Sequence, residues 1–149
     1  MKGFQFKIDG NWAHFKKPET NNNPLSHDLI PKTALIGMIG AVLGIEREKM
    51  KSLFPQLSED LLYGVELLKP VKKTSCGFTS HTAINPTAIK SPKAFEMLRD
   101  VSYKVCVGLY SERSQSIFDD FQNAILEGYA VYDPYLGIAN CPAELTFIS

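Results

Sequence analysis

Segments with the two-residue period of a β-strand alternate along this chain with segments that have the period of an α-helix. The order of these segments limits the possible folds more than any other feature of the sequence. Strands are expected at residues 3–8, 63–71, 102–110 and 143–148, and the main helices at 31–45 and 114–128. The order strand, helix, strand, strand, helix, strand predicts an α+β fold. This order of elements is typical of a ferredoxin-like, or RNA-recognition-motif-like, βαββαβ domain with helices on one face of an antiparallel sheet.

The segments between these elements contain several turn and loop signals. Asp9-Gly10 is expected to turn the chain after the first strand, and residues 12–15 extend the strand pattern beyond it. Residues 16–30 are polar and predict a loop. Residues 46–53 have the pattern of a second, short amphipathic helix.

The length of 149 residues and the hydrophobic content of 44% predict one compact domain that covers residues 1–149. Residues 72–93 stand out within it, because they are rich in Ser, Thr, Asn, Pro and Lys and have few large apolar side chains. At about 22 residues this segment is longer than an ordinary connection. We therefore expect a projecting hairpin or a functional loop there.

Charge is unevenly distributed although the formal net charge is zero. Residues 65–93 contain five basic and one acidic residue, whereas residues 94–149 contain three basic and eight acidic residues. A basic middle and an acidic C-terminal part therefore cancel. The total charge by itself indicates neither a nucleic-acid binder nor a protein of the membrane surface.

Cysteine usage and hydropathy predict a cytoplasmic protein. The three cysteines, Cys76, Cys106 and Cys141, are widely spaced and form no C-x-x-C pair, so we expect reduced thiols and no metal centre. The N-terminus lacks the apolar core of a signal peptide. The apolar run at 34–45 has twelve residues, fewer than the roughly 20 that span a bilayer, so no membrane partner is expected.

The helix expected at 31–45 contains Gly37, Gly40 and Gly44, although each interior glycine costs a helix about 0.5–1 kcal/mol relative to alanine. Close approach of another backbone explains such a cost, and that backbone belongs either to the sheet or to a nucleic-acid strand. For Gly37 and Gly40 we favour packing on the sheet. The glycines do not form a nucleotide-binding motif, so no cofactor is expected.

Several basic, aromatic and hydroxyl side chains are candidates for RNA contact, because cations follow a phosphate backbone and a ring stacks between bases. The alternative is that they are ordinary solvated side chains. The candidates are His14, Lys16 and Lys17 after the first strand, Lys32 and Thr33 at the helix start, and Lys72, Lys73, Phe78, His81, Lys90 and Lys93 in the long polar segment.

A metal-free endoribonuclease is the enzymatic alternative. His14 or His81, with a lysine and a tyrosine, would then move protons and stabilise the charge that develops on the phosphorus. Nothing in the spacing of these residues brings them together. The adjacent Asp119 and Asp120 diverge on a helix, so they predict no metal site either.

Three segments together resemble the CRISPR-associated Cas-five family of Cascade subunits, particularly its type I-B members. The resemblance runs through the whole chain. Its segments are Ala-His-Phe-Lys-Lys at 13–17, Ile-Pro-Lys-Thr-Ala-Leu-Ile-Gly at 30–37 continuing to Gly44, and Pro-Tyr-Leu-Gly-Ile-Ala-Asn at 134–140 followed by Pro-Ala-Glu at 142–144.

This resemblance implies an antiviral ribonucleoprotein subunit of the prokaryotic cytoplasm, with residues 72–93 as a thumb-like insertion. Its partners would be the five-prime handle of the guide RNA (crRNA), the backbone subunit whose filament it caps, and the large subunit that examines target DNA. It adds Tyr135 and Gly137 to the expected RNA contacts. One branch of the family cuts RNA with a tyrosine, lysine and histidine set whose spacing is absent here, so we expect no catalysis. The remaining alternative is a ferredoxin-like protein-interaction module that binds no RNA.

Overall fold

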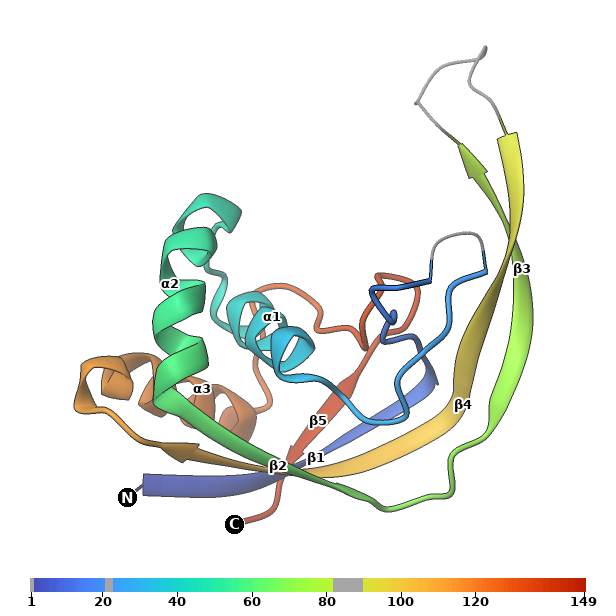
Figure 1. The fold of residues 1–149 in the computed structure, drawn as a ribbon. Helices are drawn as coiled ribbons and strands as arrows, with labels where there is room; N and C mark the ends of the chain where they lie inside the picture. Colours follow the sequence, from blue (N-terminus) through green and yellow to red (C-terminus); the bar gives the residue numbers. More distant parts are fainter. Residues whose placement is uncertain (1, 21–22, 82–89) are drawn as a thin grey trace.

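Five strands form one antiparallel sheet, and three α-helices lie on one of its faces (Figure 1). The computed structural model describes residues 2–20, 23–81 and 90–149. The elements are β1 (Lys2–Ala13), α1 (Lys32–Leu43), α2 (Arg47–Asp60), β2 (Leu61–Leu67), β3 (Lys73–His81), β4 (Lys90–Leu109), a 3-10 turn (Glu112–Ser114), α3 (Gln115–Glu127) and β5 (Glu144–Phe147). The predicted α+β class with an antiparallel sheet is confirmed.

The strand β4 is the centre of the sheet. The strand order is β2-β4-β1-β5, and β3 pairs with the first half of β4, beyond the end of β1. Residues 73–81 and 90–98 therefore form an antiparallel hairpin, one of the two structures expected for the long polar segment. Figure 1 shows this hairpin curving away from the sheet on the side that carries the helices.

The core lies between the sheet and the helices. Alternate residues of β1, Phe4, Phe6 and Ile8, are buried against this layer, and the ring of Phe6 meets the ring of Phe121 from α3 at 5.6 Å. Burying an aromatic or branched side chain of this size contributes about 1.5–3 kcal/mol. The residues between them, such as Lys7, point to the face of the sheet that carries no helix, so one face is covered and the other is open.

The predicted turn at Asp9-Gly10 is wrong, because β1 continues without interruption to Ala13. Its partner β4 is long enough to pair with β1 on both sides of Asn11, with Gly10 opposite Val101 and Trp12 opposite Arg99. Gly10 has a packing role, since a Cβ atom there would come within 2.5 Å of the Leu136 side chain. Tertiary pairing thus overrides a local turn signal.

The predicted helix at 46–53 is too short, because α2 continues past Pro55 to Asp60. A proline inside a helix removes one backbone donor and normally favours an end. Tertiary contacts stabilise the helix beyond this proline, since Leu57 is fully buried and Asp60 accepts a hydrogen bond from Arg113. β4 is likewise longer than the strand predicted at 102–110, because β3 supplies a partner for its first half.

The prediction that Gly37 and Gly40 pack against the sheet is also wrong. A Cβ atom on Gly40 would lie 3.0 Å from the Met50 sulfur, so this glycine lets α1 approach α2 and not the sheet. Gly37 is exposed, and a Cβ atom there would meet nothing within 4 Å. The helix ends as predicted at Gly44, whose φ of 69° suits a glycine.

Candidate nucleic-acid interface

A small hollow lies between α1 and the turn at residues 135–137. It has a volume of about 180 Å³ and is lined by Thr33, Ala34, Gly37, Met38, Ala41, Tyr135 and Gly137. Three of the predicted RNA contacts, Thr33, Tyr135 and Gly137, therefore come together, although Thr33 is about 100 residues from the other two in the sequence. The hollow gathers a hydroxyl group, a phenol ring and exposed backbone in one place.

The turn at 135–137 is held against the end of β1. The His14 backbone N–H donates to the Leu136 carbonyl oxygen at 3.1 Å, and the Leu136 side chain is fully buried. Gly137 has a φ of 91°, and a Cβ atom there would overlap the His14 carbonyl oxygen. Glycine is therefore required at this position. Within this fixed turn the Tyr135 side chain remains 46% exposed.

Gly37 forms the open part of the hollow. Its backbone is helical and its Cβ position is empty, so no contact within the described chain requires a glycine. A glycine in a helix interior nevertheless costs about 0.5–1 kcal/mol. The arrangement leaves room for a planar group to approach the α1 backbone beside Tyr135, and a nucleobase that stacks on an aromatic ring has this shape.

The hairpin of β3 and β4 carries a row of rings on one face. The Phe78 and Phe95 rings are 5.1 Å apart, and the Phe95 ring is 5.1 Å from the His14 ring. Lys93 lies opposite Phe78 in the strand pairing and is partly exposed. Cation and ring are therefore neighbours on the hairpin. The side chains of His81 and Lys90 lie outside the described part of the structure.

His14 does not lie on the surface, contrary to its selection as an RNA contact and as a general base. Its side chain is only 1% exposed, and its Nδ1 donates to the Glu96 carbonyl oxygen at 2.7 Å. The other ring nitrogen, Nε2, has no hydrogen-bond partner in the part of the chain that the structure describes. The sequence gives no sign that His14 is buried, because residues 95–96, which cover its ring, are far from it in the chain.

Two of the predicted lysines form contacts with other parts of the protein. The Lys73 ammonium group lies 2.8 Å from Asp28 and 3.5 Å from Glu96, and its hydrogen bond to Asp28 lowers the pKa of that carboxyl group. The Lys32 ammonium group donates to the Ser58 carbonyl oxygen near the end of α2. Lys73 is nevertheless exposed, as are Lys16 and Lys72, whereas Lys32 and Lys17 are partly exposed.

Sequence reasoning missed two cations at the base of the hairpin. Lys69 and Arg99 lie with Lys72 around Asp100, whose pKa is lowered by the hydrogen bond from Lys69 and further by the charges of Lys72 and Arg99. Asp100 has a φ of 53° and sits where β4 passes from the main sheet into the hairpin. Lys69 pairs with this carboxylate at 3.0 Å, and the charges of Lys72 and Arg99 act on its pKa from a greater distance. Lys69 and Arg99 flank residues 72–93, so a wider window on the basic segment would have found them.

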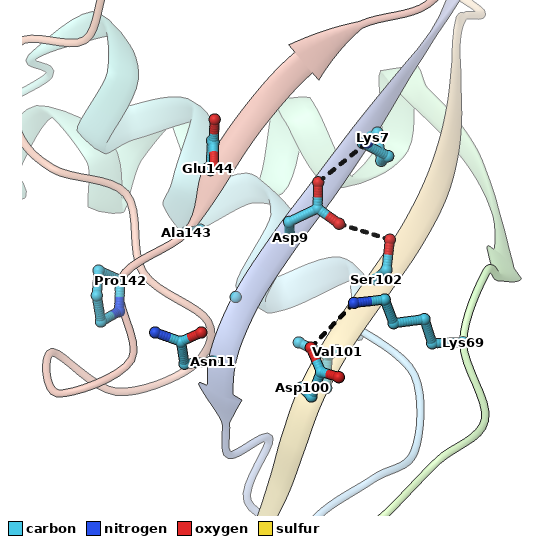
Figure 2. Close-up of a pocket in the computed structure, with 11 residues that line it drawn as sticks. Lys7, Asp9, Asn11, Lys69, Asp100, Val101, Ser102, Pro142, Ala143 and Glu144 are labelled. Carbon is cyan, nitrogen blue, oxygen red and sulfur yellow. Dashed lines mark hydrogen bonds and ion pairs between the residues drawn. The ribbon is translucent and has the colours of Figure 1, made fainter.

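The open face of the sheet carries a larger hollow of about 610 Å³ (Figure 2). Its two lysines are paired there, Lys7 with Asp9 at 3.3 Å and Lys69 with Asp100 at 3.0 Å, and Ser102 donates to Asp9 at 2.6 Å. Among the residues that line it, no side chain is aromatic. This hollow therefore lacks the free cations and rings that a nucleic acid uses.

Residues 3–147 match the family model described as CRISPR-associated protein (Cas_Cas5). The chain belongs to this family. The Cas-five resemblance is thereby confirmed, while the type I-B assignment stays a prediction. No curated protein sequence matches the chain.

Solved structures share the fold. A chain described as "CRISPR RNA-guided surveillance complex" has a TM-score of 0.69 at 17% identity, covering 93% of this chain and 58% of that one. A chain described as "Crystal Structure of CRISPR-associated Protein" has a TM-score of 0.60 at 16% identity, with coverages of 99% and 67%. A chain of a "Type IV-B CRISPR Complex" has a TM-score of 0.54 at 12% identity, with coverages of 99% and 91%. This Cas-five chain thus spans 58% to 91% of the length of these neighbours.

Across residues 2–20, 23–81 and 90–149, no helix is long and apolar enough to cross a membrane.

Proposed function

We propose that this protein is a non-catalytic RNA-binding and assembly subunit of a CRISPR Cascade complex. In this role it grips the five-prime handle of the crRNA and caps the filament of backbone subunits. The observation that carries the proposal is the hollow beside Gly37 and Tyr135. It combines an exposed ring with a helix glycine that no contact within the described chain requires. Family membership supports the same role.

In this proposal the protein contacts both the bases and the phosphates of the RNA. A splayed base of the handle stacks on Tyr135 and lies over Gly37, where the Thr33 hydroxyl group can donate or accept a hydrogen bond. The first turn of α1 has no side-chain cap, so its free N–H groups favour a phosphate. The exposed Lys16 and Lys72, with the partly exposed Lys17 and Lys93, follow the phosphate backbone.

The backbone subunit and the large subunit are the proposed protein partners, and target DNA is reached only through them. The complexes among the structural neighbours support assembly into a ribonucleoprotein of the prokaryotic cytoplasm. The endoribonuclease alternative loses one of its two histidines as a candidate, because His14 is buried.

Fluorescence anisotropy with labelled handle RNA tests the proposal. We expect the wild-type protein to bind the handle more tightly than a scrambled RNA of equal length. Tyr135→Ala should weaken handle binding by about 1–3 kcal/mol, at least fivefold, because base stacking on a ring is worth that much. The matched control is Tyr132→Ala, which removes a 53% exposed tyrosine that does not line the hollow.

Two results would contradict the proposal. Equal affinity for handle and scrambled RNA, or no binding, would argue against handle recognition altogether. Equal losses for Tyr135→Ala and Tyr132→Ala would argue against the hollow as the place where the base binds.

A further inference from the structure

The strand β2 lies at an edge of the sheet. Within residues 2–20, 23–81 and 90–149, β2 pairs with β4 on one side and with no strand on the other. Edge strands are usually protected from further pairing by prolines, lysines, bulges or a short length. β2 has seven residues, Leu-Leu-Tyr-Gly-Val-Glu-Leu, and it contains no proline, lysine or bulge. This edge therefore lacks the usual protections.

The backbone of alternate β2 residues points to the open edge. Just before β2, the Tyr110 N–H group donates to the Asp60 carbonyl oxygen at 2.7 Å. Just after β2, the Leu68 N–H group donates to the Ser102 carbonyl oxygen at 2.9 Å. Hydrogen-bonded pairs alternate along an antiparallel ladder, so the even-numbered residues of β2 bond to β4. The odd-numbered residues from 63 on turn their N–H and C=O groups outward, and these residues are Tyr63, Val65 and Leu67.

Apolar side chains line this edge on the face of the sheet that carries the helices. Tyr63, Val65 and Leu67 pair with buried residues of β4, so their side chains lie on that face. Tyr63 and Leu67 are nevertheless 36% and 42% exposed. A strand added beside β2 would cover them with its own apolar side chains on the same face.

A hollow of about 350 Å³, the β2 hollow, lies next to this edge on the face without helices. Glycines of three adjacent strands form its floor, and they are Gly64 in β2, Gly108 in β4 and Gly3 in β1. Leu62 and Cys106 border it. A Cβ atom on Gly64 would meet nothing within 4 Å, so no contact in the described chain requires a glycine there. Such a glycine often marks the close approach of another group, and an aromatic side chain of a neighbouring strand can cover it.

We propose that β2 binds an extended segment of a partner protein as a further antiparallel strand, and that an aromatic side chain of this segment fills the β2 hollow. The backbone of the segment exchanges hydrogen bonds with Tyr63 and Val65, and the residue opposite Gly64 points to the face without helices. The hydrogen bonds provide affinity for an extended chain, and the β2 hollow selects the aromatic residue. This inference does not depend on the RNA-binding proposal.

An NMR titration of the full chain tests the inference. The probe is the blocked peptide Thr-Thr-Val-Phe-Val-Thr-Thr, whose phenylalanine is designed to lie opposite Gly64. One comparison peptide has serine in place of the phenylalanine, and the other has N-methylated valines, which cannot donate hydrogen bonds to β2. We expect saturable shift changes at the amides of Tyr63, Gly64, Val65 and Cys106 with the probe. Both comparison peptides should bind about tenfold more weakly.

The variant Gly64→Val tests the β2 hollow from the side of the protein. Valine suits a strand and the Cβ position of Gly64 is empty, so we expect the variant to fold with its side chain over the floor of the hollow. It should bind the phenylalanine peptide as weakly as the wild type binds the serine peptide. Gly77→Val is the matched control, because Gly77 in β3 also has an empty Cβ position but does not line the β2 hollow. An otherwise unchanged spectrum shows that each variant is folded.

Each other outcome would overturn the inference. Equal binding of the serine peptide would exclude the β2 hollow, and equal binding of the N-methylated peptide would exclude strand addition. Equal losses for the two glycine variants would mean that the effect is not local. Shifts that do not saturate, or that fall elsewhere on the protein, would exclude the edge of β2. Shifts at the same amides on dilution of the protein alone would identify a second copy, and not a partner protein, as the occupant.

Discussion

Two glycines line the same hollow for different physical reasons. Gly137 adopts a backbone conformation that other residues avoid, and the His14 carbonyl oxygen occupies the place of its Cβ atom. Gly37 is helical, exposed and free of close neighbours. The first glycine is needed to form the turn. The second lowers the stability of the helix, and no contact in the described part of the fold compensates for this loss.

Gly37→Ala is therefore expected to stabilise the protein and to weaken RNA binding. Helix propensity predicts a gain of about 0.5–1 kcal/mol in the free energy of unfolding, measured as a higher urea midpoint at an unchanged m value. The added methyl group enters the hollow and should lower the affinity for handle RNA, measured by anisotropy.

The control for this change is Gly64→Ala, since Gly64 in β2 also has an empty Cβ position but lies away from the hollow. Its affinity for handle RNA should equal that of the wild type. A Gly37→Ala variant that binds handle RNA as tightly as the wild type would show that nothing approaches α1 at this point.

At the scale of elements, a buried carboxylate joins α2 to the 3-10 turn that precedes α3. Asp60, the last residue of α2, is 2% exposed, and it accepts hydrogen bonds from Arg113 Nε at 2.8 Å and from the Ser114 hydroxyl group. The hydrogen bond from Arg113 lowers the pKa of Asp60 below its ordinary value of 3.8. The ionised form of Asp60 is therefore the one that stabilises the fold.

The variant Arg113→Ala is expected to lower the thermal stability, because it leaves a buried carboxylate without its cation. A lowered folded-state pKa contributes stability above the unfolded value of 3.8, and this contribution is lost as the pH falls through the folded value. The difference in melting temperature between wild type and variant should therefore be largest near neutral pH and shrink below about pH 3.8, as measured by circular dichroism.

Lys51→Ala provides a comparison, because Lys51 pairs with Glu48 on the exposed surface of α2, where an ion pair contributes about 0–1 kcal/mol. Its melting temperature should stay close to that of the wild type at every pH. A difference for Arg113→Ala that does not change with pH would contradict the assignment to Asp60.

At the scale of the whole molecule, opposite charges occupy different regions. Exposed or partly exposed lysines follow the hairpin and its base, while residues 114–149 are free of basic side chains. A net charge of zero thus describes a molecule with a cationic part and an anionic part.

The salt dependence of RNA binding measures how many phosphate contacts the cationic part makes. Each phosphate contact adds about 0.7 to the slope of log K against log salt for a single strand. Lys93→Ala should therefore reduce the slope for handle RNA by about 0.7, measured by anisotropy at several salt concentrations. Lys51→Ala removes the same charge from the remote helix α2 and should leave the slope unchanged. Equal slopes for all three proteins would contradict a phosphate contact by Lys93.

Much of the fold could be predicted because its signals are local. The alternation of Phe4, Phe6 and Ile8 predicted β1, and Pro31 and Gly44 marked the ends of α1. The polarity and length of residues 72–93 predicted a projection. The continuation of β1 past Asp9-Gly10 and of α2 past Pro55 could not be predicted, because distant partners stabilise both.

The sequence by itself determined the order of the elements, the ends of α1 and the family to which the chain belongs. Only the tertiary structure decided which candidate side chains are available to a ligand. His14 is covered by the chain around Phe95, and the ammonium groups of Lys32 and Lys73 are bound by groups 23 or more residues away. Burial and ion pairing depend on such distant neighbours, which folding brings together and no local pattern records.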